Sequence, residues 1–223
     1  MYRQPAFAVS EVDALHDLID STGLCTIVSH GPSGLMASHI PMVLDRRHGE
    51  LGTLRGHVAL ANPHWNDLQA EENAAVLVIC LGPDVYVSPG SYVTKRDNPR
   101  VVPTWNYVAL HAHGTARVHR DATWLRGLVE DLTDRHEADR AEPWSVDDAP
   151  REHVDRLLKA IVGVEIRITA LDGSRKLSQN RAPADQRSVA VELASGDGDA
   201  RAISALMMSS LGNEHERRVT GGE

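Results

Sequence analysis

The sequence predicts a mainly β (α+β) fold in which an antiparallel barrel carries packed helices. Six or seven strand-like runs follow one another with turn residues between them, and most are neighbours in the sequence. The longest run alternates apolar and polar residues over 107–119. Helical spacing of apolar residues occurs before the first strand and after this long one. At 223 residues, the chain fits one large domain or one domain with a helical appendage.

The first half of the chain begins with a helix and continues with strands. Ser10 can cap this helix, and apolar residues at positions 12, 15, 18 and 19 line one of its faces. Gly31-Pro32-Ser33-Gly34 is typical of a hairpin loop. Pro41 limits pairing, so its strand is expected to lie at an edge or to bend there. The strands are expected at 25–29, 35–44, 51–60, 75–81 and 85–88.

The second half begins with the long strand at 107–119, whose even-numbered residues point one way. Asp121 is expected to cap the next helix, where Trp124, Leu125, Leu128, Val129 and Leu132 recur at helical spacing. Apolar residues at 154, 157, 158 and 161 predict another helix, and those at 162–168 predict a final strand. The SGDGD stretch after Leu193 predicts a flexible break, followed by a short helix and a polar tail over 194–223.

Composition excludes several classes of protein. Hydrophobic residues make up 42% and charged residues 24%, as in an ordinary globular chain. No apolar run approaches the ~20 residues of a membrane span, and the N-terminus lacks a signal sequence, so we expect a cytoplasmic protein. Cys25 and Cys80 lie in apolar runs and are expected to be reduced core residues. The net charge of −8 argues against a general polyanion binder.

Several segments carry more polar chemistry than a plain sheet needs. His39 precedes a strand-breaking proline, and His57 follows Gly56, whose missing side chain would let a ligand approach. Tyr86 to Tyr92 packs hydroxyls and tight turns, with Lys95 just after it. Trp105 and Tyr107 could stack on a planar ring while Asn106 bonds to its edge. Each residue also has a structural interpretation: strand histidines are usually hydrogen-bonded structural groups, and the aromatic residues could belong to the core.

Three histidines of the long strand are also candidate metal ligands. His111, His113 and His119 share one strand face, and histidines two residues apart can bind a metal. No carboxylate or thiolate cluster lies near them in the sequence. We therefore interpret this face as solvated rather than as a metal site.

Taken together, these segments resemble the PaiB-like family, the "FMN-binding negative transcriptional regulators". The resemblance covers residues 1 to about 193 and implies a split β-barrel domain of the FMN-binding or pyridoxamine oxidase-like type over 1–193. It further implies a homodimer with two cofactor sites at its interface. The segments that carry it, in the family's order, are MYRQPAF, GLMASHIPM, GTLRGHVALANPHW, LGPDVYVSPGSY, VPTWNYVALHAHG, PW (143–144), IVGVEI and KLSQN.

The chain departs from the family pattern at one position. Where the family usually has Ser-Pro-Ser-Trp-Tyr, this chain has Ser88-Pro89-Gly90-Ser91-Tyr92. Losing an indole leaves a cavity that is costly unless something fills it. A branch of the family that resembles this chain here, the piperazate synthases, binds heme b, which is larger than FMN. Gly56-His57 has a counterpart in that branch, where the histidine ligates the iron.

The resemblance implies two alternative functions. In the first, a heme b enzyme converts L-N5-hydroxyornithine, an N-hydroxylated amino acid, to L-piperazic acid by N–N bond formation with loss of water. His57 would be the axial ligand, with His64 as the next candidate, and His39, Lys95 and Tyr92 would be the candidate acid and base. In the second, the chain is an FMN-binding repressor or flavoprotein, and only then would DNA be a partner. The candidate cofactor contacts across the two hypotheses are His57, Ser88, Ser91, Thr104, Trp105 and Asn106, with Lys95 and Arg96 for the FMN phosphate.

Overall fold

The structure, a computed structural model, describes the backbone of residues 1–220 and the side chains of residues 1–212. The described chain divides into two compact units. Unit 1 comprises residues 1–9, 81–109 and 173 onward, and unit 2 comprises residues 10–80 and 110–172. Within the described part, no helix has both the length and the apolar character needed to cross a membrane. The domain boundary expected after residue 193 stays a prediction.

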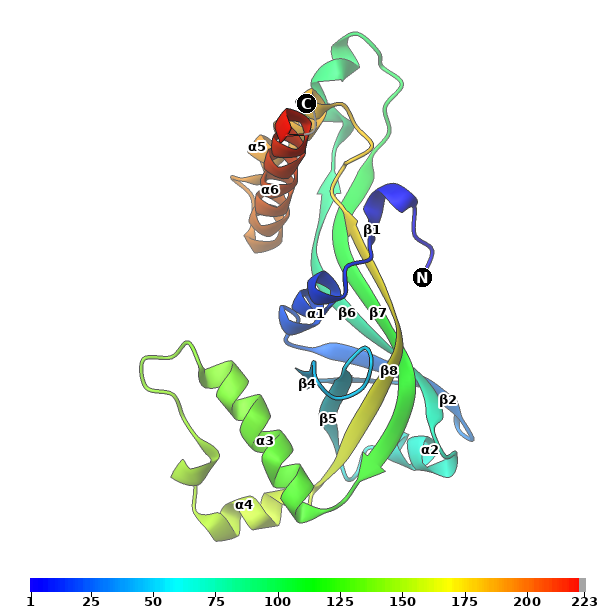
Figure 1. Ribbon diagram of the computed structural model, residues 1–223, viewed down its shortest axis with the longest axis vertical. Helices are drawn as coiled ribbons and strands as arrows, with labels where there is room; N and C mark the ends of the chain where they lie inside the picture. The colour runs from blue at the N-terminus through cyan, green and yellow to red at the C-terminus, as the bar shows by residue number, and fades with distance from the viewer. Residues whose placement is uncertain (221–223) are drawn as a thin grey trace. The chain divides into compact units, whose positions relative to one another are not determined.

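Eight strands of the described chain form one sheet, in which β3-β2-β6-β7-β8-β5-β4 are successive neighbours and β1 pairs with β8 (Figure 1). The pairs of known register are all antiparallel. This architecture confirms the predicted mainly β fold with helices. The strands are β1 (Ala8–Val9), β2 (Cys25–Gly31), β3 (Gly34–Ile40), β4 (Met42–Asp45), β5 (Thr53–Ala59), β6 (Ala74–Val87), β7 (Thr104–His119) and β8 (Ile161–Lys176).

Within unit 2, Pro41 marks the point where the sheet turns back on itself. β3 and β4 lie at opposite ends of the strand order, yet only Pro41 separates them in the chain. A Cβ on Gly56 of β5 would lie 2.8 Å from the Pro41 carbonyl oxygen and 3.2 Å from Ile40 Cδ1. Glycine is therefore needed at position 56 because another strand occupies the space. The prediction of an edge or a bend at Pro41 is confirmed.

Unit 2 has four α-helices, of which α1, α2 and α3 contact its strands while α4 packs on α3. The Asp121 side chain accepts a hydrogen bond from the Trp124 backbone N–H (2.9 Å), which confirms the predicted cap. The cap predicted at Ser10 is wrong, because Glu11 occupies the N-cap position of the first helix. The helices are α1 (Val12–Asp20), α2 (His64–Ala70), α3 (Ala122–Glu137) and α4 (Arg151–Leu158), with the 3-10 turn η4 (Val146–Asp148).

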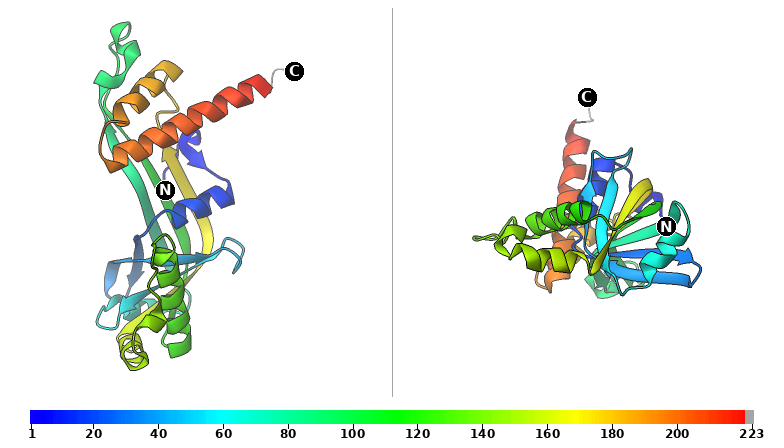
Figure 2. Two further views of the ribbon diagram at one scale, coloured as in Figure 1. Left: turned by 90° about the vertical axis from the view of Figure 1, so that its left-hand side faces the viewer. Right: turned by 90° about the horizontal axis from the view of Figure 1, so that it is seen from below.

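Unit 1 contains the end of β6, the start of β7, the end of β8 and a pair of helices. α5 (Pro183–Leu193) and α6 (Gly198–Thr220) lie side by side (Figure 2), so the last helix is longer than the sequence predicted. Short 3-10 turns complete the unit: η1 (Pro5–Phe7), η2 (Pro89–Ser91) and η3 (Val93–Arg96).

Several strand boundaries differ from the sequence predictions: the run at 35–44 is two strands, β7 begins at Thr104, and β8 continues to Lys176. The runs expected at 75–81 and 85–88 are one strand, because β2 pairs with β6 over residues 76–79 and Pro83 lies beyond that pairing. Proline has no backbone N–H to donate, but β2 does not pair with β6 at Pro83, so no hydrogen bond to β2 is lost there. Ile161, expected in a helix, opens β8. The alternation of β7 is confirmed, since Leu110, Ala112 and Ala116 are buried.

Cys25 and Cys80 are free thiols in the core of unit 2, as predicted. Their sulfur atoms lie 3.1 Å apart. Burial, together with the hydrogen bond to Cys25, raises the pKa of the Cys80 thiol, which therefore stays protonated.

Candidate functional site

His57 lies on the face of β5 that α3 covers. It pairs with Gly163 of β8, and a Cβ on Gly163 would lie only 2.1 Å from the Trp124 ring of α3. The indole therefore packs directly on the Gly163 backbone, beside the position of His57. His57 Nδ1 is buried and has no hydrogen-bond partner among the described residues. Burial lowers the pKa of His57, so its imidazole is neutral at pH values where an exposed histidine is half charged.

The surroundings of His57 are aromatic and charged. His119 stacks on Trp124 with ring centroids 4.1 Å apart and planes at 7°. His119 Nε2 lies 3.6 Å from a Glu165 carboxylate oxygen. Arg55, which shares the strand face with His57, forms an ion pair with Asp131 of α3 at 2.7 Å. A neutral imidazole with a free ring nitrogen in such a setting suits a metal bond or a proton transfer.

Two sequence interpretations near His57 are corrected by the structure. Gly56 makes room for the chain at Pro41, so it does not open the strand to a ligand. His64, a candidate alternative axial ligand, is fully buried, and both of its ring nitrogens are engaged. Nε2 lies 2.8 Å from the Ser29 hydroxyl, and Nδ1 lies 2.9 Å from the Ser38 hydroxyl. His64 is a structural histidine.

The other histidines of unit 2 have separate surroundings. His39 lies on β3, and its Nδ1 is 2.8 Å from the Thr26 hydroxyl at an exposed position. His113 Nε2 is 3.5 Å from an Asp172 carboxylate oxygen. Within the described chain, no three His, Cys, Asp or Glu side chains gather in a way that could hold a metal ion.

The segment from Ser88 to Arg96 lies in unit 1 and packs against α5. The Ser88 hydroxyl accepts a hydrogen bond from the Gly90 N–H (3.0 Å), so it caps η2. Ser91 and Tyr92 are buried, and the Tyr92 hydroxyl has no hydrogen-bond partner among the described residues. The Arg181 guanidinium lies over the Tyr92 ring, 4.8 Å from its centroid. Lys95 is exposed.

Asp185 of α5 fixes this segment in place. Its carboxylate accepts hydrogen bonds from the Thr94 backbone N–H (3.0 Å) and from the Thr94 hydroxyl (2.6 Å). Because Asp185 is buried and Thr94 precedes Lys95, this contact determines where the Lys95 side chain starts.

The start of β7 presents an aromatic surface in unit 1. Trp105 is half exposed, and its ring meets Tyr86 edge to face with centroids 6.1 Å apart. Asn106, by contrast, is completely buried. Its side-chain oxygen accepts a hydrogen bond from the Ser178 hydroxyl (3.1 Å), and its NH₂ lies 3.5 Å from the Met207 sulfur. Asn106 therefore braces the core of unit 1 and does not face a ligand.

Lys176 is a functional candidate that the sequence analysis missed. Its ammonium donates to the Thr104 hydroxyl and to the Trp105 carbonyl, and it lies 6.0 Å from the ring centroids of Phe7 and Tyr107. An ammonium has three donors, so one is left for a ligand. Burial and the positive charge of Arg181 lower the pKa of Lys176. The segment KLSQN contained the signal, but it contributed only to the family resemblance.

A small cavity of about 230 Å³ adjoins this ammonium. Tyr107, Phe7 and Lys176 line it, together with Tyr2, Gln4 and Ser174. All of these residues belong to unit 1. Aromatic rings around a cation with one free donor suit the edge of a planar molecule that carries a carbonyl or an anionic oxygen.

The predicted site residues thus fall into two groups. Ser88, Ser91, Tyr92, Lys95, Thr104, Trp105 and Asn106 belong to unit 1, while His39 and His57 belong to unit 2. Their roles in catalysis and cofactor binding stay predictions, except that Asn106 is committed to the core.

Comparison with known proteins gives consistent results. Residues 1–170 match the family described as "Putative FMN-binding domain". The chain is 30% identical to the "Protease synthase and sporulation protein PAI 2" of Bacillus subtilis, over 95% of this chain and 98% of that protein.

Among solved structures, the fold resembles that of the FAD and heme binding protein from Mycobacterium smegmatis. That match has a TM-score of 0.53 and 21% identity, over 76% of this chain and 73% of the other. The flavocytochrome Anf3 from Azotobacter vinelandii gives a TM-score of 0.53 at 12% identity, over 78% and 72% of the two chains.

Proposed function

This chain belongs to the FMN-binding domain family, and from that premise we propose that it is a flavoprotein whose flavin lies on the aromatic surface of unit 1. Two observations support this: Trp105 and Tyr86 form an exposed ring pair, and the Lys176 ammonium, which bonds to the Trp105 backbone carbonyl, keeps one donor free. Bound FMN would supply hydride and electron transfer, as flavins do.

Different residues of unit 1 would contact different parts of FMN. The Trp105 ring would pack against the isoalloxazine, since half of it is free of contacts within the chain. The Lys176 ammonium would donate to a ring carbonyl oxygen, where a nearby positive charge favours the anionic, reduced flavin. The exposed Lys95 and Arg96 would contact the ribityl phosphate through charge-assisted hydrogen bonds.

Titration of the purified apoprotein with FMN tests this proposal. Lys176→Met should weaken FMN binding about tenfold to a hundredfold, because a charge-assisted hydrogen bond is lost. Trp105→Leu should weaken it by about tenfold or less. Trp144→Leu is the matched control, since Trp144 is similarly exposed but belongs to unit 2. FMN affinities that are the same in all four proteins would contradict the proposal.

We also propose that the chain is a homodimer. Unit 1 exposes Leu81, Val93 and Val102 in addition to its aromatic pair, and a second copy of the chain would cover such apolar side chains. Light scattering at micromolar concentration should give twice the chain mass. A monomer that still binds FMN with full affinity would contradict a shared site.

A second candidate function has its own observation. The buried Nδ1 of His57 has no partner among the described residues, and its lowered pKa keeps the ring neutral, as an iron ligand must be. Proteins of this fold from Mycobacterium smegmatis and Azotobacter vinelandii are described as heme-binding and as a flavocytochrome, which supports considering heme b here too. Bound heme would supply a Lewis-acidic iron, with His57 as its ligand.

The heme hypothesis extends to the reaction that the sequence resemblance implies. In L-N5-hydroxyornithine the α-amine nitrogen would bond to N5 while the N–O bond breaks, and the hydroxyl would leave with a proton as water. His39, Tyr92 and Lys95 remain the proposed acid and base. Of these, Lys95 is exposed, while the Tyr92 hydroxyl is buried without a partner.

Hemin titration tests the second candidate. His57→Ala should abolish the Soret band, whereas His30→Ala, at an exposed position of β2, should leave it unchanged. Ser91→Trp refills the position where the family usually has an indole, and it should weaken hemin binding about tenfold or more. Full hemin binding by both His57→Ala and Ser91→Trp would remove the support for heme.

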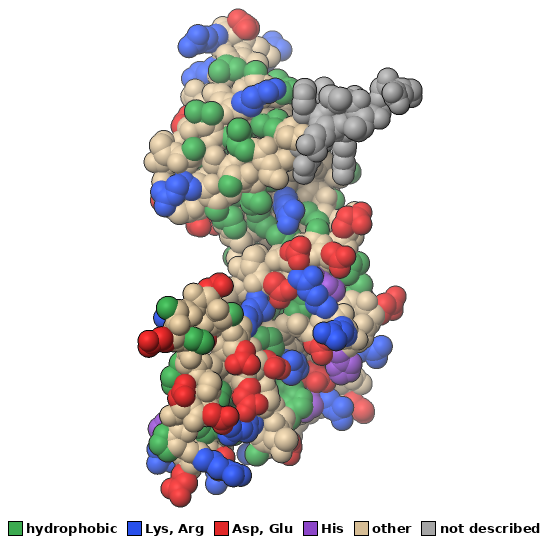
Figure 3. Space-filling view, turned by 60° about the vertical axis from the view of Figure 1, so that its left-hand side comes forward, with side chains coloured by type: hydrophobic (Ala, Val, Ile, Leu, Met, Phe, Trp, Pro, Cys, Tyr) green, Lys and Arg blue, Asp and Glu red, His purple; other side chains and the backbone are tan. Residues whose placement is uncertain are grey.

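DNA binding belongs only to the regulator version of the flavin proposal. On the face drawn in Figure 3, acidic and basic side chains are interspersed over unit 2 without a broad field of positive charge. With a net charge of −8, the chain should bind DNA weakly at physiological salt unless the dimer presents a local basic surface. An electrophoretic shift assay across salt concentrations measures this directly.

A further inference from the structure

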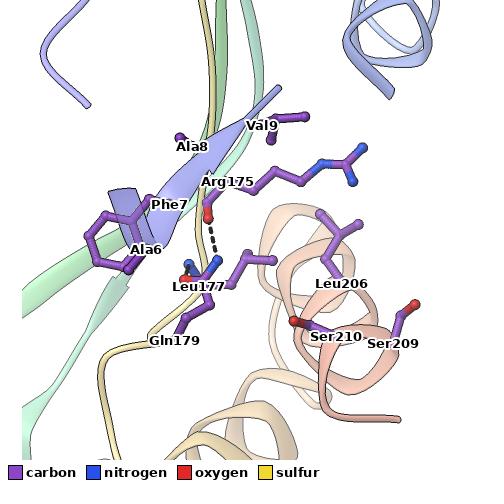
Figure 4. Close-up of a pocket in the computed structure, with 10 residues that line it drawn as sticks. All are labelled: Ala6, Phe7, Ala8, Val9, Arg175, Leu177, Gln179, Leu206, Ser209 and Ser210. Atoms are coloured by element: carbon purple, nitrogen blue, oxygen red, sulfur yellow. Dashed lines mark hydrogen bonds between the residues drawn. The ribbon is translucent and has the colours of Figure 1, made fainter. Parts of the chain in front are cut away.

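A second and larger cavity of unit 1 lies between the N-terminal strand, the end of β8 and α6 (Figure 4). Its volume is about 610 Å³, which is within the range of small-molecule sites in proteins. Phe7, Val9, Leu177 and Leu206 form the apolar part of its wall. It contains none of the residues assigned above to the flavin or to heme, except that Phe7 also lines the small cavity beside Lys176.

Among the described residues that line this cavity, Arg175 is the one with a formally charged side chain. Successive strand residues point to opposite faces of a sheet, so Arg175 lines this cavity whereas Lys176 lines the smaller one. Whereas the Lys176 ammonium is held by two oxygen atoms, Arg175 Nε is buried without a hydrogen-bond partner in the described part of the chain. No ion pair of Arg175 is found there either. Arg175 as a whole is partly exposed, but burying its Nε–H without a partner is costly, and an anion in the cavity would relieve that cost.

The opposite wall adds small polar groups. Leu206, Ser209 and Ser210 stand three and four residues apart on α6, so they share the helix face that lines the cavity (Figure 4). The carboxamide of Gln179 is already used, since it bonds to the Arg175 carbonyl oxygen (2.5 Å) and the Leu177 N–H (2.6 Å). Gln179 therefore holds the end of β8, and the two serine hydroxyls remain as partners for a ligand.

We propose that this cavity binds an amphipathic monocarboxylate, a small molecule with an apolar body and one carboxylate group. A planar guanidinium matches a carboxylate through two parallel hydrogen bonds. One arginine among the described lining residues does not suit a phosphate ester or another polyanion, which needs several positive groups. This site does not depend on the flavin or heme proposals.

Isothermal titration calorimetry with decanoate and with 1-decanol separates the charge from the apolar body. Decanoate should bind wild-type protein at least about tenfold more tightly than decanol. Arg175→Gln should weaken decanoate binding about tenfold to a hundredfold and leave decanol unchanged. Arg187→Gln is the matched control, because Arg187 is an exposed arginine of α5 in the same unit, and it should behave as wild type.

Ser210→Phe provides an independent test that leaves the arginine in place. A phenyl ring from α6 should fill part of the cavity and weaken decanoate and decanol alike. Equal affinities of wild type for the two ligands, or unchanged decanoate binding in Arg175→Gln, would overturn the proposal. FMN titration of Arg175→Gln should match wild type, so a failure here is distinguishable from a failure of the flavin proposal.

Discussion

Buried polar groups of this chain differ in whether their hydrogen bonds are complete, and the contrast is clearest between His64 in unit 2 and the end of β8 in unit 1. Both ring nitrogens of His64 are hydrogen-bonded to serine hydroxyls, and the residue is completely enclosed. At the end of β8, Arg175 Nε has no partner in the described chain, and Lys176 keeps one free donor.

The difference separates structural groups from candidate ligand-binding groups. A buried polar group whose hydrogen bonds are complete stabilises the fold and has nothing left to offer a ligand. A buried group that lacks a partner destabilises the isolated protein, so it is expected where a ligand completes it. By this criterion His57 belongs with Arg175, although it lies in the same unit as His64.

Removing His64 should have the largest effect on stability. His64→Ala leaves a cavity and deprives the hydroxyls of Ser29 and Ser38 of a partner, so the free energy of unfolding should fall by about 3 kcal/mol. Chemical denaturation measures this, with the exposed His30→Ala as control. A loss below about 1 kcal/mol would mean that the serines find other partners and that the comparison is wrong.

Asp185 is a buried group of unit 1 whose carboxylate accepts two hydrogen bonds. Replacing it tests whether such a group stabilises unit 1 as His64 stabilises unit 2. Asp185→Asn weakens its contacts with the Thr94 N–H and hydroxyl, so we expect a loss of about 1–2 kcal/mol in denaturant unfolding. The same variant should weaken FMN binding if Lys95 contacts the phosphate, because Thr94 positions Lys95. A loss of stability with unchanged FMN affinity would separate Lys95 from the cofactor.

Stability should also depend on pH through the buried histidines. Burial lowers the pKa of His64 below its ordinary 6.5, so the unfolded chain binds a proton more readily than the folded one. The contribution of His64 is therefore full above about pH 6.5 and is lost as the pH falls toward the folded-state pKa. Denaturant unfolding from about pH 7 to about pH 5 should show a shallower decline in His64→Ala than in wild type or His30→Ala. Parallel declines would show that the pKa of His64 is the same in the folded and the unfolded chain, which would contradict this prediction.

The smallest effect is expected at Arg175. Arg175→Gln removes a charge that has no partner in the described chain, so the free energy of unfolding should change by no more than about 0.5 kcal/mol or should rise. Denaturation without added ligand measures this. A loss as large as that of His64→Ala would mean that Arg175 has a structural partner, and the distinction between the two regions would fail.

Much of the fold could be predicted from local patterns. The alternation of β7, the Asp121 cap of α3 and the bend at Pro41 follow from residue spacing and proline chemistry, and the structure confirms all three. Local signals failed where a distant strand decided the outcome. The Gly82-Pro83 pair looked like a break, but Pro83 lies beyond the pairing with β2, so β6 continues.

The candidate site was less predictable for the same reason. Trp105 and Lys95 were singled out from the sequence, and both are exposed in unit 1. Asn106 was expected to bond to a ligand, but its partners Ser178 and Met207 lie about seventy and a hundred residues further along the chain. Lys176 was missed because its contacts with Thr104 and Trp105 exist only after β7 and β8 have come together.

The sequence by itself determined the class of fold, the family, and which residue types could bind a planar cofactor. These properties depend on the period of apolar residues and on the side chains' own chemistry, which neighbours in sequence already express. Only the tertiary structure decided which polar groups are satisfied. His57 and His64 stand seven residues apart and look equivalent in the sequence, yet serines from β2 and β3 complete the hydrogen bonds of one and no described residue completes those of the other. Whether the hydrogen bonds of a buried group are complete depends on residues that are distant in the sequence and come into contact only in the folded chain.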